Sequence, residues 1–418
     1  MYKNISQCRI CGNKELREVL DLGEQFLSSA FVKSNEADEL SQTRVPLTVL
    51  LCSTCGLVQL RETVDRDLMY RSYFYRSETN PMMREALQDV VRDITARVNL
   101  RAGDAVLDIG CNDGTMLTYY PSTLRRFGMD PAKNIDRTSL PSSITVIEDY
   151  FSGEKSLTAS GSRYKVVSSI AMFYDLDDPN TFVSEVKSIL AAEGLWCVQL
   201  SYLGATIKTM NFYDVCHEHL LYYSLRTLAY LMERHGLKIV DVSENDVNGG
   251  SLRLFVAHAD DPRPVSPDVK KMLEAEEALK LSDVATYERF SADIQRLKTV
   301  VLDFIRKEGE AGGQVIGLGA STKGNVLLQY FGITKEMLPA ISERNPEKVG
   351  LRTLGTDIEL VSEEAGRKLH PSAMLVLIWF FKEELLKREQ EYLEAGGKLL
   401  FPMPYPHVVT KGGEERLG

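Results

Sequence analysis

The stretch Ala105–Leu117 reads AVLDIGCNDGTML, which is an apolar run, a turn rich in glycine and small polar residues, and the start of a helix. Glycine at positions 110 and 114 lets the backbone approach a ligand closely. The spacing is D-x-G-x-x-x-G rather than the G-x-G-x-x-G of dinucleotide-binding turns. A turn that carries carboxylates would repel a pyrophosphate but accepts a sulfonium. We therefore expect a Rossmann-like domain whose S-adenosylmethionine contacts include Asp108, Gly110, Asn112, Asp113 and Gly114.

Two later strand ends extend this pattern. Phe127–Pro131 reads FGMDP and ends a second strand with an acid, where a carboxylate can hold both ribose hydroxyls. Glu148–Phe151 ends a third strand, at the position where such domains contact adenine, and Tyr164–Met172 predicts the fourth strand. Glycine and aspartate as plain turn formers remain the alternative. The further cofactor contacts expected here are Asp130, Pro131, Asp149, Tyr150 and Phe151.

Length and composition exclude several classes of protein. The chain has 418 residues, which predicts two to three domains, and its 44% hydrophobic and 26% charged residues are ordinary globular values. Its net charge is 49 − 59 = −10, which argues against general binding to nucleic acid or to an anionic membrane. No run reaches the ~18 apolar residues of a membrane span. The N-terminus lacks a signal-peptide pattern, so we expect a cytoplasmic protein.

The pattern of turns and apolar runs divides the chain into four parts. Residues 1–75 are short and rich in turns, and residues 76–262 alternate strand-like and helical segments, which is typical of an α/β domain. A proline-rich segment at 260–267 leads into a helical connector, 263–310, with one long helical stretch over about 267–307. Residues 311–418 repeat the α/β pattern. The expected fold class is α/β, with Rossmann-like middle and C-terminal domains.

Four of the seven cysteines form two CxxC pairs, each followed by glycine. A thiolate pair at this spacing can hold one side of a tetrahedral zinc ion. Residues 12–51 separate the pairs, more than the ~15–20 residues of a compact zinc ribbon, so a loop must be inserted between them. Four independent core cysteines are the alternative. The predicted structural zinc ligands are Cys8, Cys11, Cys52 and Cys55.

A His217-Glu218-His219 cluster stands just before Ser224, a predicted helix N-cap. Histidine titrates near ~6.5 and can take a proton from a carbon acid at neutral pH. Glu218 could orient a histidine or hold a sugar hydroxyl. A metal site is less favoured, because the pattern is not H-E-x-x-H and no third ligand is evident. A hydrogen-bonded surface loop is the alternative.

A second strand–turn–helix pattern follows at Gln314–Asn325. It fails the P-loop pattern, but its amides and Lys323 could hold a substrate diphosphate at a helix N-terminus. A turn without a ligand is the alternative. An NAD-dependent oxidoreductase would use this turn, but Pro339–Glu343 is late and polar, so no acid closes a clear second strand. A zinc-knuckle interaction module is a third class.

With these motifs, the chain resembles the C-methyltransferases of nucleotide-linked 4-keto-deoxysugars. The double CxxC, the turn at 108–114, the His-Glu-His cluster, Gly249-Gly250-Ser251 and Gly319–Asn325 occur there in this order, across nearly the whole chain. The resemblance implies an N-terminal zinc-binding domain, a central class I methyltransferase domain and a C-terminal Rossmann-like domain, with the substrate among them. It implies an S-adenosylmethionine-dependent enzyme, monomer or homodimer, that methylates C3 of a thymidine- or guanosine-diphosphate-linked 4-keto-6-deoxysugar.

The resemblance also implies roles for individual residues. His219 is the general base that forms an enolate, Glu218 contacts the sugar, His217 adjoins them, and Tyr174 or Tyr75 stabilises the enolate. Three positions depart from relatives: Cys216 replaces a tyrosine, Tyr174 replaces a histidine, and Trp379-Phe380 stands where relatives have a Trp-Asn pair. These departures leave open the sugar, the methylated carbon and even the acceptor. The implied cofactor contact is Ser77, and the implied substrate contacts are Cys216, Tyr222, Asn248, Gly250, Ser251, Ser321, Lys323 and Asn325.

Overall fold

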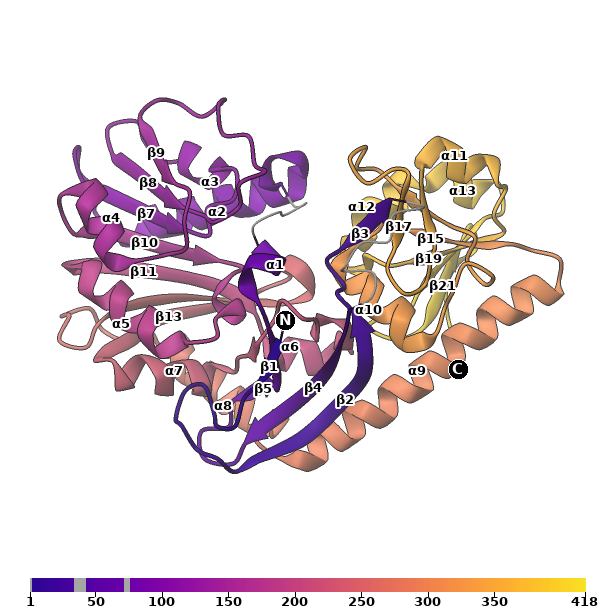
Figure 1. Cartoon of the computed structure of the whole chain (residues 1–418), viewed down its shortest axis with the longest axis horizontal. Coiled ribbons are helices and arrows are strands. Elements are labelled where there is room, and N and C mark those ends of the chain that lie inside the picture. The colour runs from indigo at the N-terminus through magenta and orange to yellow at the C-terminus, as the bar shows by residue number, and fades with distance from the viewer. Residues whose placement is uncertain (1, 34–42, 71–75) are drawn as a thin grey trace.

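The apolar runs around the first glycine turn form the centre of a mixed sheet in the computed structural model of the chain, which describes residues 2–33, 43–70 and 76–418 (Figure 1). The strands of this sheet are β7 (Ala105–Ile109), β8 (Arg125–Met129), β9 (Ile144–Ile147), β10 (Tyr164–Ile170), β11 (Leu190–Ser201), β13 (Leu237–Asn245) and β14 (Ser251–His258). Their order is β13-β14-β11-β10-β7-β8-β9, and β7 to β11 are parallel. The four predicted strands are confirmed.

Helices cover both faces of this sheet because neighbouring strand residues point to opposite sides. Val106 packs with Val90 and Ile94 of α2 on one face, whereas Leu107 belongs to the core on the other face, with Phe182 of α5. Ser224 caps α7 as predicted, since its hydroxyl accepts the amide of Thr227. The helices are α2 (Pro81–Arg97), α3 (Thr115–Thr118), α4 (Gly153–Ser160), α5 (Pro179–Ile189), α6 (Leu203–Lys208) and α7 (Leu225–Arg234).

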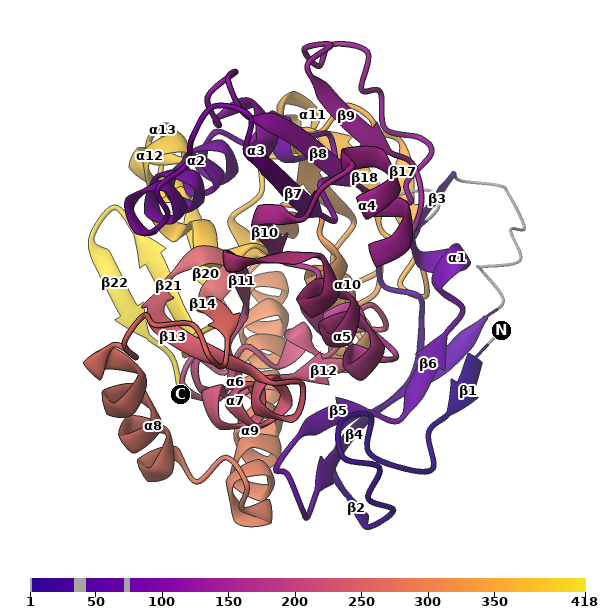
Figure 2. The same cartoon turned by 90° about the vertical axis from the view of Figure 1, so that its left-hand side faces the viewer.

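The N-terminal strands form a long curved hairpin that lies below and between the two larger sheets in Figure 1. The hairpin itself is formed by β2 (Leu16–Phe26) and β4 (Arg44–Cys52). The other elements of the N-terminal region are β1 (Tyr2–Asn4), β3 (Phe31–Lys33), β5 (Val58–Leu60), β6 (Glu62–Val64) and α1 (Arg66–Tyr70). β1 pairs with β6 at the right of Figure 2. β5 pairs with β12 (Leu221–Tyr222), which directly follows the His-Glu-His cluster. The strand order β12-β5-β4-β2 therefore includes a strand of the middle domain.

The C-terminal residues form a second sheet with the order β22-β21-β20-β19-β15-β16-β18-β17-β3. Its last strand, β3, comes from the N-terminal region and pairs with β17. The elements are β15 (Val315–Leu318), α10 (Thr322–Phe331), β16 (Ala340–Glu343), β17 (Leu351–Thr353), β18 (Glu359–Ser362), α11 (Glu363–Lys368), β19 (Ala373–Val376), α12 (Lys382–Arg388), α13 (Gln390–Glu394), β20 (Lys398–Phe401), β21 (His407–Thr410) and β22 (Gly413–Arg416).

The expectation that Pro339–Glu343 closes no clear second strand is wrong. Residues 340–343 form β16, which is buried and parallel to β15. The polar end of β16 is accommodated because the Glu343 carboxylate accepts the amides of Ala320 and Asn345, both at 2.7 Å. Glu343 thus holds the C-terminal glycine turn in place.

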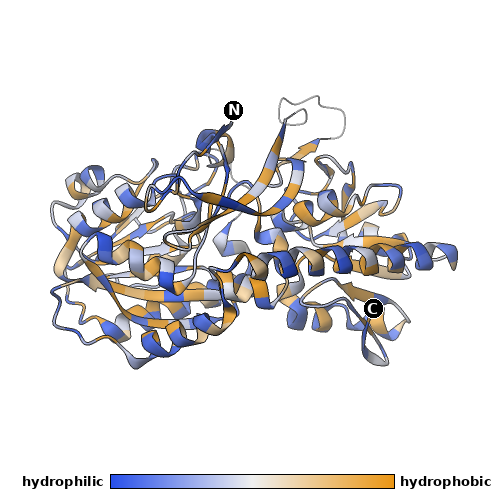
Figure 3. Ribbon diagram, turned by 90° about the horizontal axis from the view of Figure 1, so that it is seen from below, coloured by the Kyte–Doolittle hydropathy of each residue, from blue (hydrophilic) through white to orange (hydrophobic). Residues whose placement is uncertain are grey.

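The connector also differs from the expected single helical stretch. It consists of two helices, α8 (Pro267–Leu279) and α9 (Val284–Glu310). The break occurs because Lys280 adopts a left-handed conformation (φ 52°) and the Asp283 side chain caps the new helix. Figure 3 shows polar and apolar residues alternating along α9, whose buried stripe includes Phe290, Ile294 and Leu297. None of the described helices has the length and apolar character needed to cross a membrane.

Candidate active site

A cavity of about 1590 Å³ opens at the carboxyl ends of the parallel strands of the middle sheet and extends to the C-terminal domain. This is the edge at which open α/β sheets bind ligands. The predicted cofactor residues that line it are Ser77, Asp108, Gly110, Asn112, Asp130, Pro131, Tyr150 and Phe151, and the predicted catalytic and substrate residues are Tyr174, Cys216, His217, Glu218, His219, Asn248, Ser321 and Lys323.

The glycine turn after β7 has the geometry that its sequence predicts. Gly110 has a φ of +74°, and a Cβ there would lie 3.0 Å from Cγ of Met172. Asp108 is buried, and burial raises the pKa of its carboxyl to about 7, although the Ser168 hydroxyl donates to it at 2.7 Å. The backbone therefore forms a close-fitting wall that a flat ligand can approach.

The acid at the end of β8 is already tied to this turn. The Asp130 carboxylate accepts the amides of Asn112 and Ala132, both at 2.9 Å, and pairs with Arg137 at 3.0 Å. Burial raises the pKa of Asp130, and these donors oppose that rise. Asp130 is thus held rigidly at the cavity wall, where its remaining lone pairs can accept ribose hydroxyls.

Three predicted cofactor residues do not line the cavity. Asp113 accepts the amides of Glu78 and Thr115, so it fastens the segment that includes Ser77 onto the turn. Gly114 packs against Leu140. Asp149 forms an ion pair with the Lys155 amine, and its neighbours Tyr150 and Phe151 face the cavity instead.

The His219 ring has a defined tautomer. Its Nδ1 lies 2.9 Å from the backbone oxygen of Asp214, and since a carbonyl only accepts, Nδ1 carries the hydrogen. Nε2 then keeps its lone pair. Burial lowers the pKa of His219 to about 4, an effect that the nearby carboxylate of Asp214 opposes and the amine of Lys323 reinforces. The Tyr174 ring packs against the imidazole, with the centroids 4.3 Å apart. The His219 imidazole is therefore neutral at physiological pH.

Asp214 is a functional candidate that the sequence reasoning did not single out. Its Oδ1 lies 3.6 Å from Nδ1 of His219 and 2.5 Å from Nζ of Lys323. Burial alone would raise the pKa of Asp214, but the charge of Lys323 and the nearby His219 lower it below its ordinary value. Lys323 also reaches the backbone oxygen of Asn248 at 3.3 Å. Lys323, expected against a diphosphate, is here the partner of a buried carboxylate.

The N-terminal hairpin holds the loop that carries the cluster. His217 donates from Nε2 to the backbone oxygen of Val45 at 3.0 Å. The Tyr70 hydroxyl donates to the backbone oxygen of Glu218 at 3.1 Å. The backbone amide of Leu60 donates to the backbone oxygen of Leu220 at 2.8 Å. Tyr75, a predicted catalytic residue, lies outside the described residues.

Other predicted substrate residues serve the local structure. The Tyr222 hydroxyl donates to the backbone oxygen of His219, and the Ser251 hydroxyl donates to the backbone oxygen of Val247, both at 2.8 Å. Asn325 donates to the backbone of Ser28 at 2.6 Å. Along with Gly250, these residues are absent from the described cavity wall.

The four cysteines of the CxxC pairs converge at one point. Sγ of Cys8 lies 3.6 Å from Sγ of Cys55, and Sγ of Cys11 lies 3.5 Å from Sγ of Cys52. All four sulfurs lie within 4.8 Å of one another. Tetrahedral zinc with Zn–S bonds of about 2.3 Å separates its sulfurs by about 3.7 Å, so the arrangement fits this ion.

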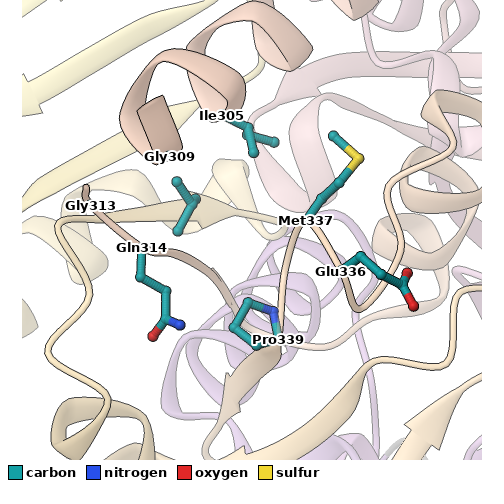
Figure 4. Close-up of a pocket in the computed structure, with 8 residues that line it drawn as sticks. Ile305, Gly309, Gly313, Gln314, Glu336, Met337 and Pro339 are labelled. Carbon is teal, nitrogen blue, oxygen red and sulfur yellow. The ribbon is translucent and has the colours of Figure 1, made fainter. Parts of the chain in front are cut away.

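A smaller pocket of about 240 Å³ lies between the end of α9 and β15 (Figure 4). Apolar side chains such as Ile305, Met337 and Pro339 shape it. Of its described lining residues, Glu336 alone is titratable. The larger cavity is therefore the candidate active site.

Comparisons with known proteins match three family models to the chain. A zinc binding domain matches residues 8–70, a methyltransferase domain residues 83–242, and a C-methyltransferase C-terminal domain residues 246–404. The chain is 30% identical over 414 residues to C-methyltransferase NovU of Streptomyces niveus, covering 98% of each.

Two solved methyltransferases resemble part of the chain. The plantazolicin methyltransferase BpumL, solved in complex with SAH, has a TM-score of 0.34 and 14% identity over 43% of this chain and 84% of its own. The magnesium protoporphyrin IX methyltransferase of Synechocystis PCC 6803 has a TM-score of 0.33 and 15% identity over 43% of this chain and 88% of its own.

Proposed function

Since the chain belongs to the family of C-methyltransferases with an N-terminal zinc-binding domain, we propose that it methylates C3 of a nucleotide-linked 4-keto-6-deoxysugar. The predictions of a methyltransferase, of S-adenosylmethionine and of structural zinc are confirmed. Family membership favours methyl transfer over the oxidoreductase alternative. One observation carries the proposal: a neutral histidine base with a defined tautomer lines the same cavity as the glycine turn.

The position of His219 suits it to remove a proton from the sugar. The hydrogen of a carbon beside a ketone is acidic enough for a positioned imidazole to remove. Nε2 of His219 receives this proton, and the Asp214 carboxylate, 3.6 Å from Nδ1, stabilises the imidazolium that results. Asp214 and Lys323 thus act on the base without touching the sugar.

The enolate oxygen needs a donor, and Tyr174 is suited to that role. Burial keeps the pKa of Tyr174 well above 10, so the phenol retains its proton. Its ring contacts His219 and lines the cavity. A donor aimed at the developing charge in a place shielded from water lowers the barrier. Glu218, beside the base, accepts a sugar hydroxyl.

S-adenosylmethionine supplies an electrophilic methyl group. Of the residues that line the cavity, Asp130 would hold the ribose, Tyr150 and Phe151 would flank the adenine, and Gly110 would provide the close backbone wall. Ser321 and Asn248 also line the cavity, and they would face the thymidine or guanosine diphosphate of the substrate. Holding both ligands in this one cavity would place the methyl group in line with the carbanion.

The test measures deprotonation at C3 and methyl transfer in separate experiments. Nucleotide-linked 4-keto-6-deoxysugars are incubated with the enzyme in D₂O without methyl donor, and deuterium at C3 is followed by NMR. Mass spectrometry with S-adenosylmethionine then detects one added methyl group. We expect His219→Asn to abolish both signals. His370→Asn changes an exposed histidine of the C-terminal domain and should retain both. Methylation without exchange at C3 would refute the proposed carbon and base.

A further inference from the structure

Three side chains of different chemistry converge beside the proposed base. Cys216, Glu218 and His219 offer a sulfur, a carboxylate oxygen and an imidazole nitrogen that all lie within 4.8 Å of one another. All three residues line the main cavity. They are almost completely buried, with exposed fractions of 0%, 5% and 8%. The sequence alone indicated no third ligand for the His-Glu-His cluster. In the structure, Cys216, the residue directly before the cluster, takes that place.

This set of donor atoms is one that zinc prefers. Zn²⁺ binds thiolate, imidazole and carboxylate in tetrahedral sites, and sites with three protein ligands leave the fourth position for water or another small ligand. The cavity provides room for such a ligand. The four-cysteine site, in contrast, fills all four positions with protein sulfur.

The surroundings of His219 resemble those of a metal-bound histidine. A histidine ligand commonly donates its other N–H to a carbonyl or carboxylate, which orients the ring and selects the tautomer. Nδ1 of His219 donates to the Asp214 backbone oxygen at 2.9 Å, and the Asp214 carboxylate lies 3.6 Å away. Nε2 is left as the nitrogen that can bind a cation.

Acidic groups lie close to the three donor atoms. The carboxyl group of Asp175 interacts with those of Asp214 and Glu218, and all three interact with Cys216. Lys323 is the cation paired with Asp214. Within the described part of the chain, Oδ1 of Asp175 has no hydrogen-bond partner. A bound dication would compensate this concentration of acidic groups.

We propose that Cys216, Glu218 and His219 form a second, inhibitory metal site for Zn²⁺ inside the reaction cavity. The zinc ion exchanges bound water for the three side chains, and the thiol proton of Cys216 is released to solvent as the sulfur–metal bond forms. The metal occupies Nε2 of His219, so the lone pair that accepts the substrate proton is no longer available. The inhibition rests on the proposed function, whereas metal binding does not.

Binding is tested with Co²⁺ on enzyme that retains one zinc ion per chain. A cobalt–thiolate bond absorbs in the near ultraviolet, and elemental analysis after desalting counts the second ion. We expect the band and the second ion in the native chain and in Cys197→Ser, which changes a buried thiol of the same domain away from the cavity. Cys216→Ser should lose the band, and Glu218→Gln should weaken binding, because it replaces a carboxylate ligand by a neutral amide. Absence of a second ion in the native chain, or a band that survives in folded Cys216→Ser, would overturn the proposal.

Inhibition is a separate readout. Micromolar Zn²⁺ should stop deuterium exchange at C3 in the native enzyme, and a weak chelator that leaves the four-cysteine zinc in place should restore it. If no sugar shows exchange, the proposed function is refuted. The cobalt–thiolate band then still shows whether Cys216, Glu218 and His219 bind a metal ion. If Co²⁺ binds but Zn²⁺ leaves exchange unchanged, the inhibitory role is refuted.

Discussion

Replacing Lys323 by methionine tests the link between the C-terminal domain and the proposed base. The change keeps the length of the side chain but removes the amine that lies 2.5 Å from Oδ1 of Asp214. The side chains of Lys323 and Asp214 are 14% and 1% exposed, so solvent screens the pair weakly. At an effective dielectric constant of about 20, charges at this distance attract by about 6–7 kcal/mol before desolvation is subtracted. Breaking a buried pair by removing one partner typically costs ~3–5 kcal/mol.

Two measurements check this prediction. Denaturant unfolding of Lys323→Met should show a loss of ~3–5 kcal/mol, and the double variant Asp214→Asn/Lys323→Met should recover much of it, because no buried charge is left unpaired. Because the Lys323 amine helps to lower the pKa of His219, its removal raises that pKa from about 4. Activity needs neutral His219, so the acid limb of the kcat/KM profile moves to higher pH. Lys323→Arg should retain the native limb. If Lys323→Met has native stability and an unshifted acid limb, Lys323 has no positioning role.

Three further outcomes follow from the site. In the native enzyme, the acid limb of C3 deuterium exchange should lie near pH 4, below the ~6.5 of ordinary histidine, because burial disfavours the imidazolium; a limb at 6.5 would contradict the buried base. Gly110→Ala should weaken S-adenosylmethionine binding in calorimetry, because position 110 has a φ of +74° and an added Cβ would contact Met172. Gly161→Ala is the control: position 161 has a φ of +64° but open space around it, so the change should cost only ~1 kcal/mol of stability. Stripping zinc should abolish exchange and lower the melting temperature, because β5 pairs with the strand that follows His219. One equivalent of Zn²⁺, which refills the four-cysteine site without excess, should restore both; exchange that persists without zinc would show that the hairpin does not position the base.

Local patterns in the sequence predicted the parts of the fold that local interactions determine. The strand–turn–helix at 105–117 needs its glycines because Gly110 and Gly114 both have positive φ. The CxxC pairs could be assigned to zinc since each tight turn places two sulfurs together. The N-cap at Ser224 likewise depends only on residues three positions apart.

Contacts between distant residues could not be predicted in this way. Lys323 is 109 positions from Asp214 (323 − 214), and no periodicity joins the two. The break at Lys280 was missed because lysine carries no general signal for a left-handed conformation. The end of β16 was judged too polar for a strand, since the amides that satisfy Glu343 come from a turn on another strand and from a neighbouring loop.

Two strand pairings join the N-terminal region to later parts of the chain, β5 with β12 and β3 with β17. They have a consequence for how the chain folds during synthesis. The zinc-binding hairpin leaves the ribosome before the middle domain, yet β5, which pairs with β4 along one edge, acquires its second partner only when residues 221–222 have been made. β3 has to wait longer, because its partner is Leu351–Thr353. Unpaired strand edges on a nascent chain are exposed to wrong partners until they are covered. This early segment therefore reaches its final form only after residues 351–353 have been made.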